Sequence, residues 1–385
     1  MIDATTSPPV PAEPTVAVAV NLLWCVPGDV GGSEQYLVRQ LLGLTAQPTH
    51  YSPTLYCLAS FADAHPELGT HTRIVTAPID GASRPRRIVA EHTWLRRRTR
   101  RADIVHHGGG TAPTVGRRPI VLTIHDLQYL THPEYLTPTK RRYLERAIPR
   151  SVRRAAVVAV PTEYVRSTVL DAYAPDPDRV VVVPHGIEST LGDAAPDAAE
   201  VRRRYRLGNG RLLVYPAVTH PHKNHRFLLE VMARYWTDPD LRVVLLGGRG
   251  SAEADIAADI LRLGLGSRVV RPGRVPEADR DGLIAAADAL VFPSQYEGFG
   301  APVAEAMALG TPVICSDQRA LAEVVGDAGL VLPLAPEAWE GALDELATRG
   351  DTLVAQGRRR ADDFSIERSG AALADAYALA VRVGR

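Results

Sequence analysis

The chain has 385 residues, which at about 150 residues per domain suggests two domains and excludes a single short binding module. Hydrophobic residues make up 45% of the chain and charged residues 23%, a balance that excludes global disorder and supports a sizeable core. Lys plus Arg and Asp plus Glu number 44 each, so the overall charge does not indicate a nucleic-acid-binding or membrane protein.

The positive charge is nevertheless concentrated in one segment. Residues 84–154 contain 17 basic and 5 acidic residues, a net charge of +12. Lys140 and Lys223 are the only lysines in the chain, so arginine supplies the charge almost everywhere. A lysine therefore indicates a specific requirement for an ammonium group.

The cysteines and the N-terminus favour a cytoplasmic protein. The three cysteines, Cys25, Cys57 and Cys315, are far apart in apolar surroundings, which predicts reduced core thiols and no disulfide framework. Residues 1–14 contain four prolines and no basic region, which predicts a disordered leader and not a signal peptide. The longest apolar run, residues 16–26, is too short to span a bilayer.

Short β-branched runs alternate with stretches at helical spacing, the pattern of parallel strands joined by crossover helices. The first predicted strand is followed by a glycine-containing loop at 27–32 and by a helix that begins with Ser33 as its N-cap. The predicted strands of this half are 16–26, 54–59, 102–107, 119–125, 157–161 and 179–184.

A second series of the same kind follows an Asp-, Ala- and Pro-rich stretch at 191–200. Its predicted strands are 212–217, 242–248, 269–273, 289–293 and 311–316, and a helix is predicted at 365–383. We therefore expect an α/β protein with a leader (1–14), two Rossmann-like domains (15–190 and 191–360) and a C-terminal helical segment (361–385) that can return to the N-terminal domain.

Glu297 and Glu305 bracket a Gly-Phe-Gly loop between a strand and a helix that has Pro302 near its first position. Loop amides at a helix N-terminus favour an anion, and carboxylates accept several hydrogen bonds from sugar hydroxyls. The pattern predicts a pocket that both carboxylates can face, and the alternative is a solvated loop followed by a glutamate near the start of a helix.

This spacing resembles the E-x7-E motif of the retaining GT-B glycosyltransferases of family 4, which use nucleotide diphosphate sugars. Other stretches match the family in the same order over about residues 16–335. They are Gly31 to Glu34, Thr123 to Asp126, Val183 to Gly186, Pro216 to Asn224 and Pro272 to Pro276. Five motifs in order make coincidence improbable.

The resemblance implies roles for the donor side of the cleft. Glu305 would bind the nucleotide ribose and Glu297 the sugar hydroxyls, while Lys223, with Asn224 beside it, would bind the diphosphate. The amides of Phe299, Gly300 and Ala301 would contact sugar and phosphate, and the backbone of Val275 would contact the base. Many family members also carry an arginine upstream of the lysine. This chain has none there, and His220, His222 or an arginine from elsewhere remain open as substitutes.

The resemblance also implies roles for the N-terminal domain. His125 follows a predicted strand, where open α/β sheets place ligands. It aligns with a histidine that bonds the donor sugar, so His125 and Glu297 are the expected catalytic residues. Gly31 and Gly32 allow a close backbone approach and would face the donor phosphates and the acceptor.

No metal-ligand cluster is readable, and we expect metal-independent chemistry without a cofactor. Asp176-Pro177-Asp178 and Asp238-Pro239-Asp240 spell D-x-D, but both stand in proline-containing turns.

Arg96, Arg97, Arg98, Arg100 and Arg101 form the densest part of the basic segment. They are either an ordinary solvated face or a patch for an anionic acceptor or an anionic membrane. No nucleic-acid-binding motif accompanies them, and no nucleic-acid partner is expected.

We therefore expect a cytoplasmic retaining hexosyltransferase, with peripheral membrane attachment left open. Mannose from GDP-mannose is favoured over glucose from UDP-glucose, and the acceptor is a glycan or glycolipid hydroxyl. Two alternatives remain: a nucleotide-sugar epimerase or phosphorylase of the same fold, and a non-catalytic protein that binds nucleic acid or membrane through residues 84–154.

Overall fold

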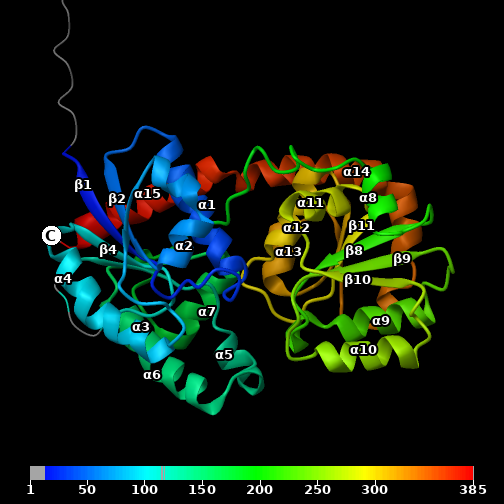
Figure 1. The fold of residues 1–385 in the computed structure, drawn as a ribbon, viewed down its shortest axis with the longest axis horizontal. Coiled ribbons are helices and arrows are strands. Elements are labelled where there is room, and N and C mark those ends of the chain that lie inside the picture. The colour runs from blue at the N-terminus through cyan, green and yellow to red at the C-terminus, as the bar shows by residue number, and fades with distance from the viewer. Residues whose placement is uncertain (1–13, 114–115, 117, 385) are drawn as a thin grey trace, which may run out of the picture.

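The computed structural model describes residues 14–113, 116 and 118–384. The leader expected at 1–14 lies outside the described residues except for Pro14. Figure 1 shows two α/β halves side by side, each with its own twisted sheet. The predicted fold class, two Rossmann-like domains, is confirmed.

The sheet of the N-terminal half has seven strands in the order β3-β2-β1-β4-β5-β6-β7, and every neighbouring pair is parallel. Its strands are β1 (Val16–Asn21), β2 (Tyr51–Cys57), β3 (Arg73–Thr76), β4 (Ile104–His107), β5 (Ile120–Thr123), β6 (Val157–Val160) and β7 (Val180–Val182). The central strands are almost wholly apolar because helices cover both faces of a parallel sheet.

The sheet of the C-terminal half has six strands in the order β10-β9-β8-β11-β12-β13, again all parallel. Its strands are β8 (Leu212–Pro216), β9 (Arg242–Leu246), β10 (Val269–Gly273), β11 (Ala289–Phe292), β12 (Val313–Ser316) and β13 (Leu330–Leu332). The strand order reverses between β8 and β11, the place where such sheets bind ligands.

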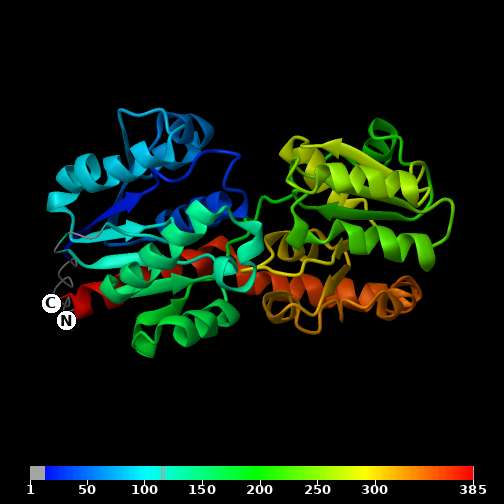
Figure 2. The same cartoon turned by 90° about the horizontal axis from the view of Figure 1, so that it is seen from below.

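Helices pack on both faces of each sheet (Figures 1 and 2). In the N-terminal half they are α1 (Gly32–Ala46), α2 (Ala59–Ala64), α3 (Arg84–Ala90), α4 (Arg96–Arg98), α5 (Gln128–Thr131), α6 (Pro138–Arg154) and α7 (Glu163–Tyr173). In the C-terminal half they are α8 (Ala198–Arg204), α9 (His225–Arg234), α10 (Glu253–Arg262), α11 (Glu277–Ala285), α12 (Ala301–Leu309), α13 (Arg319–Val325) and α14 (Ala342–Ala361).

The last helix, α15 (Ile366–Val383), lies against the N-terminal half, as both views show. It packs on α1 so closely that a Cβ on Gly43 would lie 1.8 Å from the carbonyl oxygen of Ile366. The chain crosses between the halves twice, and Ile187 joins the two crossings by backbone hydrogen bonds of 2.7 and 3.1 Å to Phe364 and Ile366.

Some local expectations were wrong. Strands β3 and β13 were not predicted, and β1 ends at Asn21 instead of residue 26. Ser33 is not the N-cap of α1: Gly31 caps the helix without a side-chain hydrogen bond, at a positive φ of 62° that glycine adopts without strain.

Cys25, Cys57 and Cys315 are buried and free. Of the helices within the described part of the chain, none combines the length and apolar character that a bilayer crossing requires.

Candidate active site

The candidate site lies where loops that follow strands of one half contact loops that follow strands of the other. Arg274, just after β10, donates a hydrogen bond from Nη2 to the carbonyl oxygen of Gly28, which follows β1. Gly298, after β11, packs against His125, after β5. The carboxyl ends of strands from both sheets therefore line one interdomain site, where α/β proteins bind their ligands.

The loop between β11 and α12 needs its glycines. A Cβ on Gly298 would lie 2.1 Å from the carbonyl oxygen of His125, so only glycine allows this approach. Gly300 has a φ of +88°, and a Cβ there would lie 2.3 Å from Leu321. Helix α12 starts directly after it at Ala301, so the positive end of the helix dipole lies at the end of this loop.

Glu305 lies inside α12 and is buried. Its Oε1 accepts a hydrogen bond of 2.7 Å from Nη1 of Arg39 in α1, and Nε of Arg39 donates to Glu188 at 2.8 Å. Burial alone would raise the pKa of Glu305, but the charges of Arg39 and Arg280 lower it below its ordinary value. The carboxylate is therefore ionised and able to accept hydrogen bonds at neutral pH.

Glu297 and Lys223 form an ion pair, with 2.6 Å between Nζ and Oε1. Lys223 ends a short 3₁₀ turn (Pro221–Lys223) after β8, and Glu297 lies in the loop after β11. Their side chains are 19% and 11% exposed, so the pair faces the site from neighbouring strands without being fully buried. The structure thus brings together the two residues assigned to the sugar and the diphosphate.

The residues around Lys223 explain how the turn is built. Asn224 adopts a left-handed conformation, with φ 57° and ψ 38°, between the 3₁₀ turn and α9. Burial lowers the pKa of His222 to about 3 and lowers that of His220 below its ordinary value. Both imidazoles are therefore neutral at pH 7 and cannot replace a missing arginine as cations.

His125 is held from three sides. Its Nε2 donates to the carbonyl oxygen of Gly108 at 2.8 Å, and its ring lies 5.7 Å from Trp24 and 5.2 Å from Tyr36 between ring centres. Burial lowers its pKa to about 4. At neutral pH the ring is uncharged, with the proton on Nε2, so Nδ1 can accept a hydrogen bond.

Gly31 and Gly32 face open space, because a Cβ on either would have no atom within 4 Å. The adjacent Gly28 is crowded instead, since its Cβ would lie 2.8 Å from Nη1 of Arg274. Val275, next to Arg274, is half-buried and packs on the C-terminal core. The glycine loop therefore contacts the β10–α11 loop through Gly28, while its Gly31 and Gly32 remain uncovered.

Further contacts fix the two halves relative to each other. Thr162 donates to the carbonyl oxygen of Gly298 at 2.9 Å, and the hydroxyl of Tyr296 accepts from the amide of Leu127 at 3.0 Å. The carboxylate of Glu323 accepts from the first two amides of α7 at 2.7 and 2.8 Å.

The basic residues 96–98, 100 and 101 are exposed and lie far along the N-terminal half from the donor-side residues (Figure 1). Asp176 and Asp238 each accept a hydrogen bond from the amide two residues ahead, at 3.1 and 2.9 Å, as turn residues do. Over residues 14–113, 116 and 118–384, no group of three or more His, Cys, Asp or Glu could hold a metal ion.

Sequence reasoning missed Arg39, Arg274 and Tyr296. Arg39 did carry a signal, because it stands on the apolar face of α1 between Tyr36 and Leu41, where a buried arginine requires a partner. Arg274 lies in the motif at 272–276 but received no role, and Tyr296 carried no signal, since the contacts of both depend on how the halves meet.

Comparison with known proteins places this arrangement in a family. Residues 30–191 match the model for Glycosyltransferase Family 4, and residues 197–360 match the model for glycosyl transferases group 1. The O-antigen chain mannosyltransferase B of Escherichia coli is 32% identical over 60% of this chain and 61% of its own length. The D-inositol 3-phosphate glycosyltransferase of Corynebacterium glutamicum is 28% identical over 91% and 92% of the two chains.

Solved structures agree on the fold. The Anabaena protein HepE in complex with UDP and glucose superposes with a TM-score of 0.74 at 18% identity, covering 94% of this chain and 99% of HepE. WaaG, a glycosyltransferase involved in lipopolysaccharide biosynthesis, gives 0.71 at 19% identity, covering 93% and 98%. With both halves matched in order and the GT-B architecture in place, the chain belongs to the GT-B glycosyltransferases of family 4.

Proposed function

We propose that this protein transfers a hexose, with mannose from GDP-mannose as the donor of choice, to a hydroxyl of a glycan or glycolipid acceptor with retention of configuration. The observation that carries the proposal is the convergence of Lys223, Glu297 and the N-terminus of α12 opposite His125. The choice of mannose rests on likeness to mannosyltransferases such as that of Escherichia coli.

The donor side provides a complementary contact for each part of a nucleotide sugar. Glu305 accepts hydrogen bonds from ribose hydroxyls through the oxygen that Arg39 leaves available. Lys223, beside Asn224, and the amides of residues 299–301 bind the diphosphate and sugar. The Val275 backbone contacts the base, and Glu297 accepts from the sugar hydroxyls.

Many family members carry an arginine upstream of the lysine that matches Lys223, and this chain does not. We propose that Arg274 supplies this second positive charge to the diphosphate. It comes from the C-terminal half and reaches the glycine loop that contains Gly31 and Gly32, which the family uses against the donor phosphates. An arginine fork suits a diphosphate because it donates two parallel hydrogen bonds.

The reaction proceeds without a protein nucleophile. The bond from the anomeric carbon to the phosphate oxygen breaks, the acceptor oxygen bonds to the same face of that carbon, and the acceptor proton goes to an oxygen of the leaving phosphate. Neutral His125 accepts a hydrogen bond from the sugar at Nδ1, while its Nε2 stays bonded to Gly108. Glu297 stabilises the positive charge that develops on the sugar.

The experiment is incubation of GDP-mannose with and without candidate acceptors, followed by product analysis. The proposal expects acceptor-dependent release of GDP and an α-linked product. Turnover of the nucleotide sugar without an acceptor would instead support an epimerase.

We assign the arginines at 96–98, 100 and 101 to an anionic acceptor or to the anionic membrane that carries it. Their neutralisation should release the enzyme from anionic vesicles or raise KM for an anionic acceptor, and the effect should fade as salt shortens the Debye length below about 10 Å. Unchanged vesicle binding and acceptor kinetics at low salt would make these arginines ordinary surface charge.

A further inference from the structure

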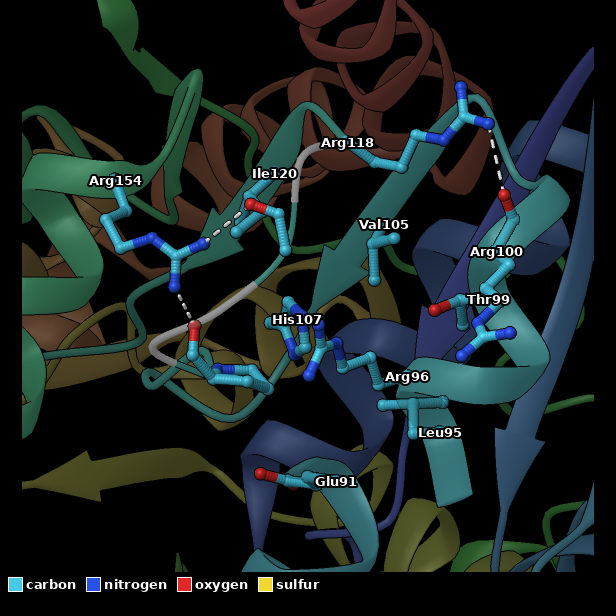
Figure 3. Close-up of a pocket in the computed structure, with 12 residues that line it drawn as sticks. Glu91, Leu95, Arg96, Thr99, Arg100, Val105, His107, Arg118, Ile120 and Arg154 are labelled. Carbon is cyan, nitrogen blue, oxygen red and sulfur yellow. Dashed lines mark hydrogen bonds between the residues drawn. The ribbon is translucent and has the colours of Figure 1, made fainter. Parts of the chain in front are cut away.

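A cavity of about 630 Å³ opens in the N-terminal half, away from the donor residues. Val105 and His107 of β4 line the cavity. His106, which lies between them in the strand, faces the other side of the sheet and hydrogen-bonds Tyr377 of α15. The cavity therefore lies on the sheet face opposite α15, between residues 91–100 and the end of α6 (Figure 3). Its size is typical of a small-molecule site.

Four arginines surround the cavity: Arg96, Arg100, Arg118 and Arg154. Arg154 is fixed by hydrogen bonds to the carbonyl oxygens of Pro113 and Gly116, and Arg118 by one to the carbonyl oxygen of Arg100. Figure 3 shows Arg118 and Arg154 on opposite sides, with Arg96 extending toward His107 between them. Among the described residues, none of the four has an ion-pair partner.

The other titratable residues that line the cavity are Glu91 and His107. Glu91 is buried, and burial raises its pKa above the ordinary value. Burial lowers the pKa of His107 to about 3, so its ring is neutral. The side-chain amide of Asn21 donates to both, at 3.1 Å each, and holds them in place. The cavity therefore presents four guanidinium groups against the single carboxyl group of Glu91, an excess of positive charge that attracts an anion.

The spacing of two of these arginines increases the repulsion. Arg96 and Arg100 stand four residues apart in a helical segment, where like charges are neighbours and repel. A bound phosphate removes that repulsion and accepts several hydrogen bonds from guanidinium groups.

The floor of the cavity has a different character. Leu95, Val105 and Ile120 contribute apolar side chains to the lining, although they are only 2%, 8% and 7% exposed. A free inorganic anion would leave this surface uncovered, whereas an apolar chain attached to the anion would cover it.

We propose that this cavity binds the phosphate group of an amphiphile, with Arg96, Arg100, Arg118 and Arg154 around the phosphate and the apolar chain over Leu95, Val105 and Ile120. The site also narrows the acceptor class of the proposed function. His107 lines the cavity, and the next residue, Gly108, bonds His125, so the end of β4 connects the cavity to the proposed reaction centre.

The test is calorimetric titration of the full chain with dioctanoyl phosphatidic acid below its micellar concentration. We expect the double variant Arg96→Gln/Arg100→Gln to raise Kd at least about ten-fold, because charge-assisted hydrogen bonds are lost. The matched control, Arg146→Gln/Arg150→Gln, removes two exposed charges with the same four-residue spacing from α6, outside the cavity lining and outside residues 96–101. Its Kd should stay within about two-fold of wild type, since exposed charges contribute little.

Two further ligands test the two parts of the site. Inorganic phosphate and dioctanoylglycerol should each bind more weakly than phosphatidic acid, because each lacks one half of the amphiphile. Equal losses in the two double variants would overturn the proposal in favour of diffuse surface charge, and equal affinity for either partial ligand would overturn the amphiphile.

Vesicles containing phosphatidic acid identify the source of the ligand. If vesicle binding also requires Arg96 and Arg100, the ligand is a membrane lipid, whereas dependence confined to the monomeric lipid indicates a soluble amphiphile. Titration of the same preparations with GDP reports on the donor site, so failure of this proposal is distinguishable from failure of the proposed function.

Discussion

Arg39 donates a hydrogen bond from Nη1 to Oε1 of Glu305 at 2.7 Å, and this buried ion pair joins α1 of one half to α12 of the other. Removing one partner of a buried pair leaves the other charge without compensation. Glu188 also binds Arg39, so the arginine retains one carboxylate if Glu305 is replaced. The residue assigned to the ribose therefore also connects the two halves.

Replacement of Glu305 should act on nucleotide affinity. We expect Glu305→Ala to raise Kd for GDP by about ten-fold or more, because hydrogen bonds to a charged group are lost. The ribose contact exists in ground and transition states alike, so kcat at saturating donor should change far less. Calorimetric titration and steady-state kinetics measure the two effects.

Replacement of Glu297 should act on the chemical step. Glu297→Gln keeps the size of the side chain and a hydrogen-bond acceptor for Lys223, but removes the charge that faces the sugar. We expect kcat to fall on the order of 100-fold with donor affinity nearly unchanged. Equal losses of donor affinity in this variant and in Glu305→Ala would disprove the division of roles.

Arg274 provides a test of the substitute cation. We expect Arg274→Gln to weaken GDP binding by about ten-fold, because a charge-assisted contact with the diphosphate is lost. Arg271→Gln is the matched control, since Arg271 lies three residues upstream and pairs with Glu253 instead. If both variants bind GDP like the wild type, Arg274 does not contact the diphosphate.

The buried histidines predict acid sensitivity. Burial lowers the pKa of His106 and His107 to about 3 each, from an ordinary value of 6.5. Below pH 6.5 the unfolded chain binds protons that the folded chain does not, so stability is lost as pH falls from about 6.5 toward 4. Tm should therefore fall over this range, and His106→Gln should make the fall shallower. A wild-type Tm that stays constant from pH 7 to about 4.5 would contradict this.

The fold was predictable because apolar β-branched runs recur at regular spacing between amphipathic stretches. The edge strands β3 and β13 were not, since they have only four and three residues and half-buried patterns. The start of β2 was also missed, because Pro53 argues against a central strand. Proline has no N–H, and at Pro53 the missing donor would point toward β3. Strand β3 pairs with β2 only from Thr54 onward, so the β2–β3 ladder loses no hydrogen bond at Pro53.

The site was predictable only within each half. Lys223 and Glu297 follow neighbouring strands, so their proximity results from the order of a parallel sheet. Arg39 and Glu305 are 266 positions apart, and their contact depends on how two separate domains meet. No local pattern encodes that orientation, which is why the partners of Arg39 and Arg274 in the opposite half emerged only from the structure.

The central claim is that the interdomain site binds a nucleotide diphosphate sugar through protein groups alone. Titration of the wild-type chain with GDP-mannose in excess EDTA tests it most directly. The account predicts one ligand per chain, tighter binding than for UDP-glucose, and about 2.7 kcal/mol of added stability at a hundredfold excess over Kd. Absence of binding for every nucleotide sugar, or binding that appears only when a divalent metal is restored, would contradict it.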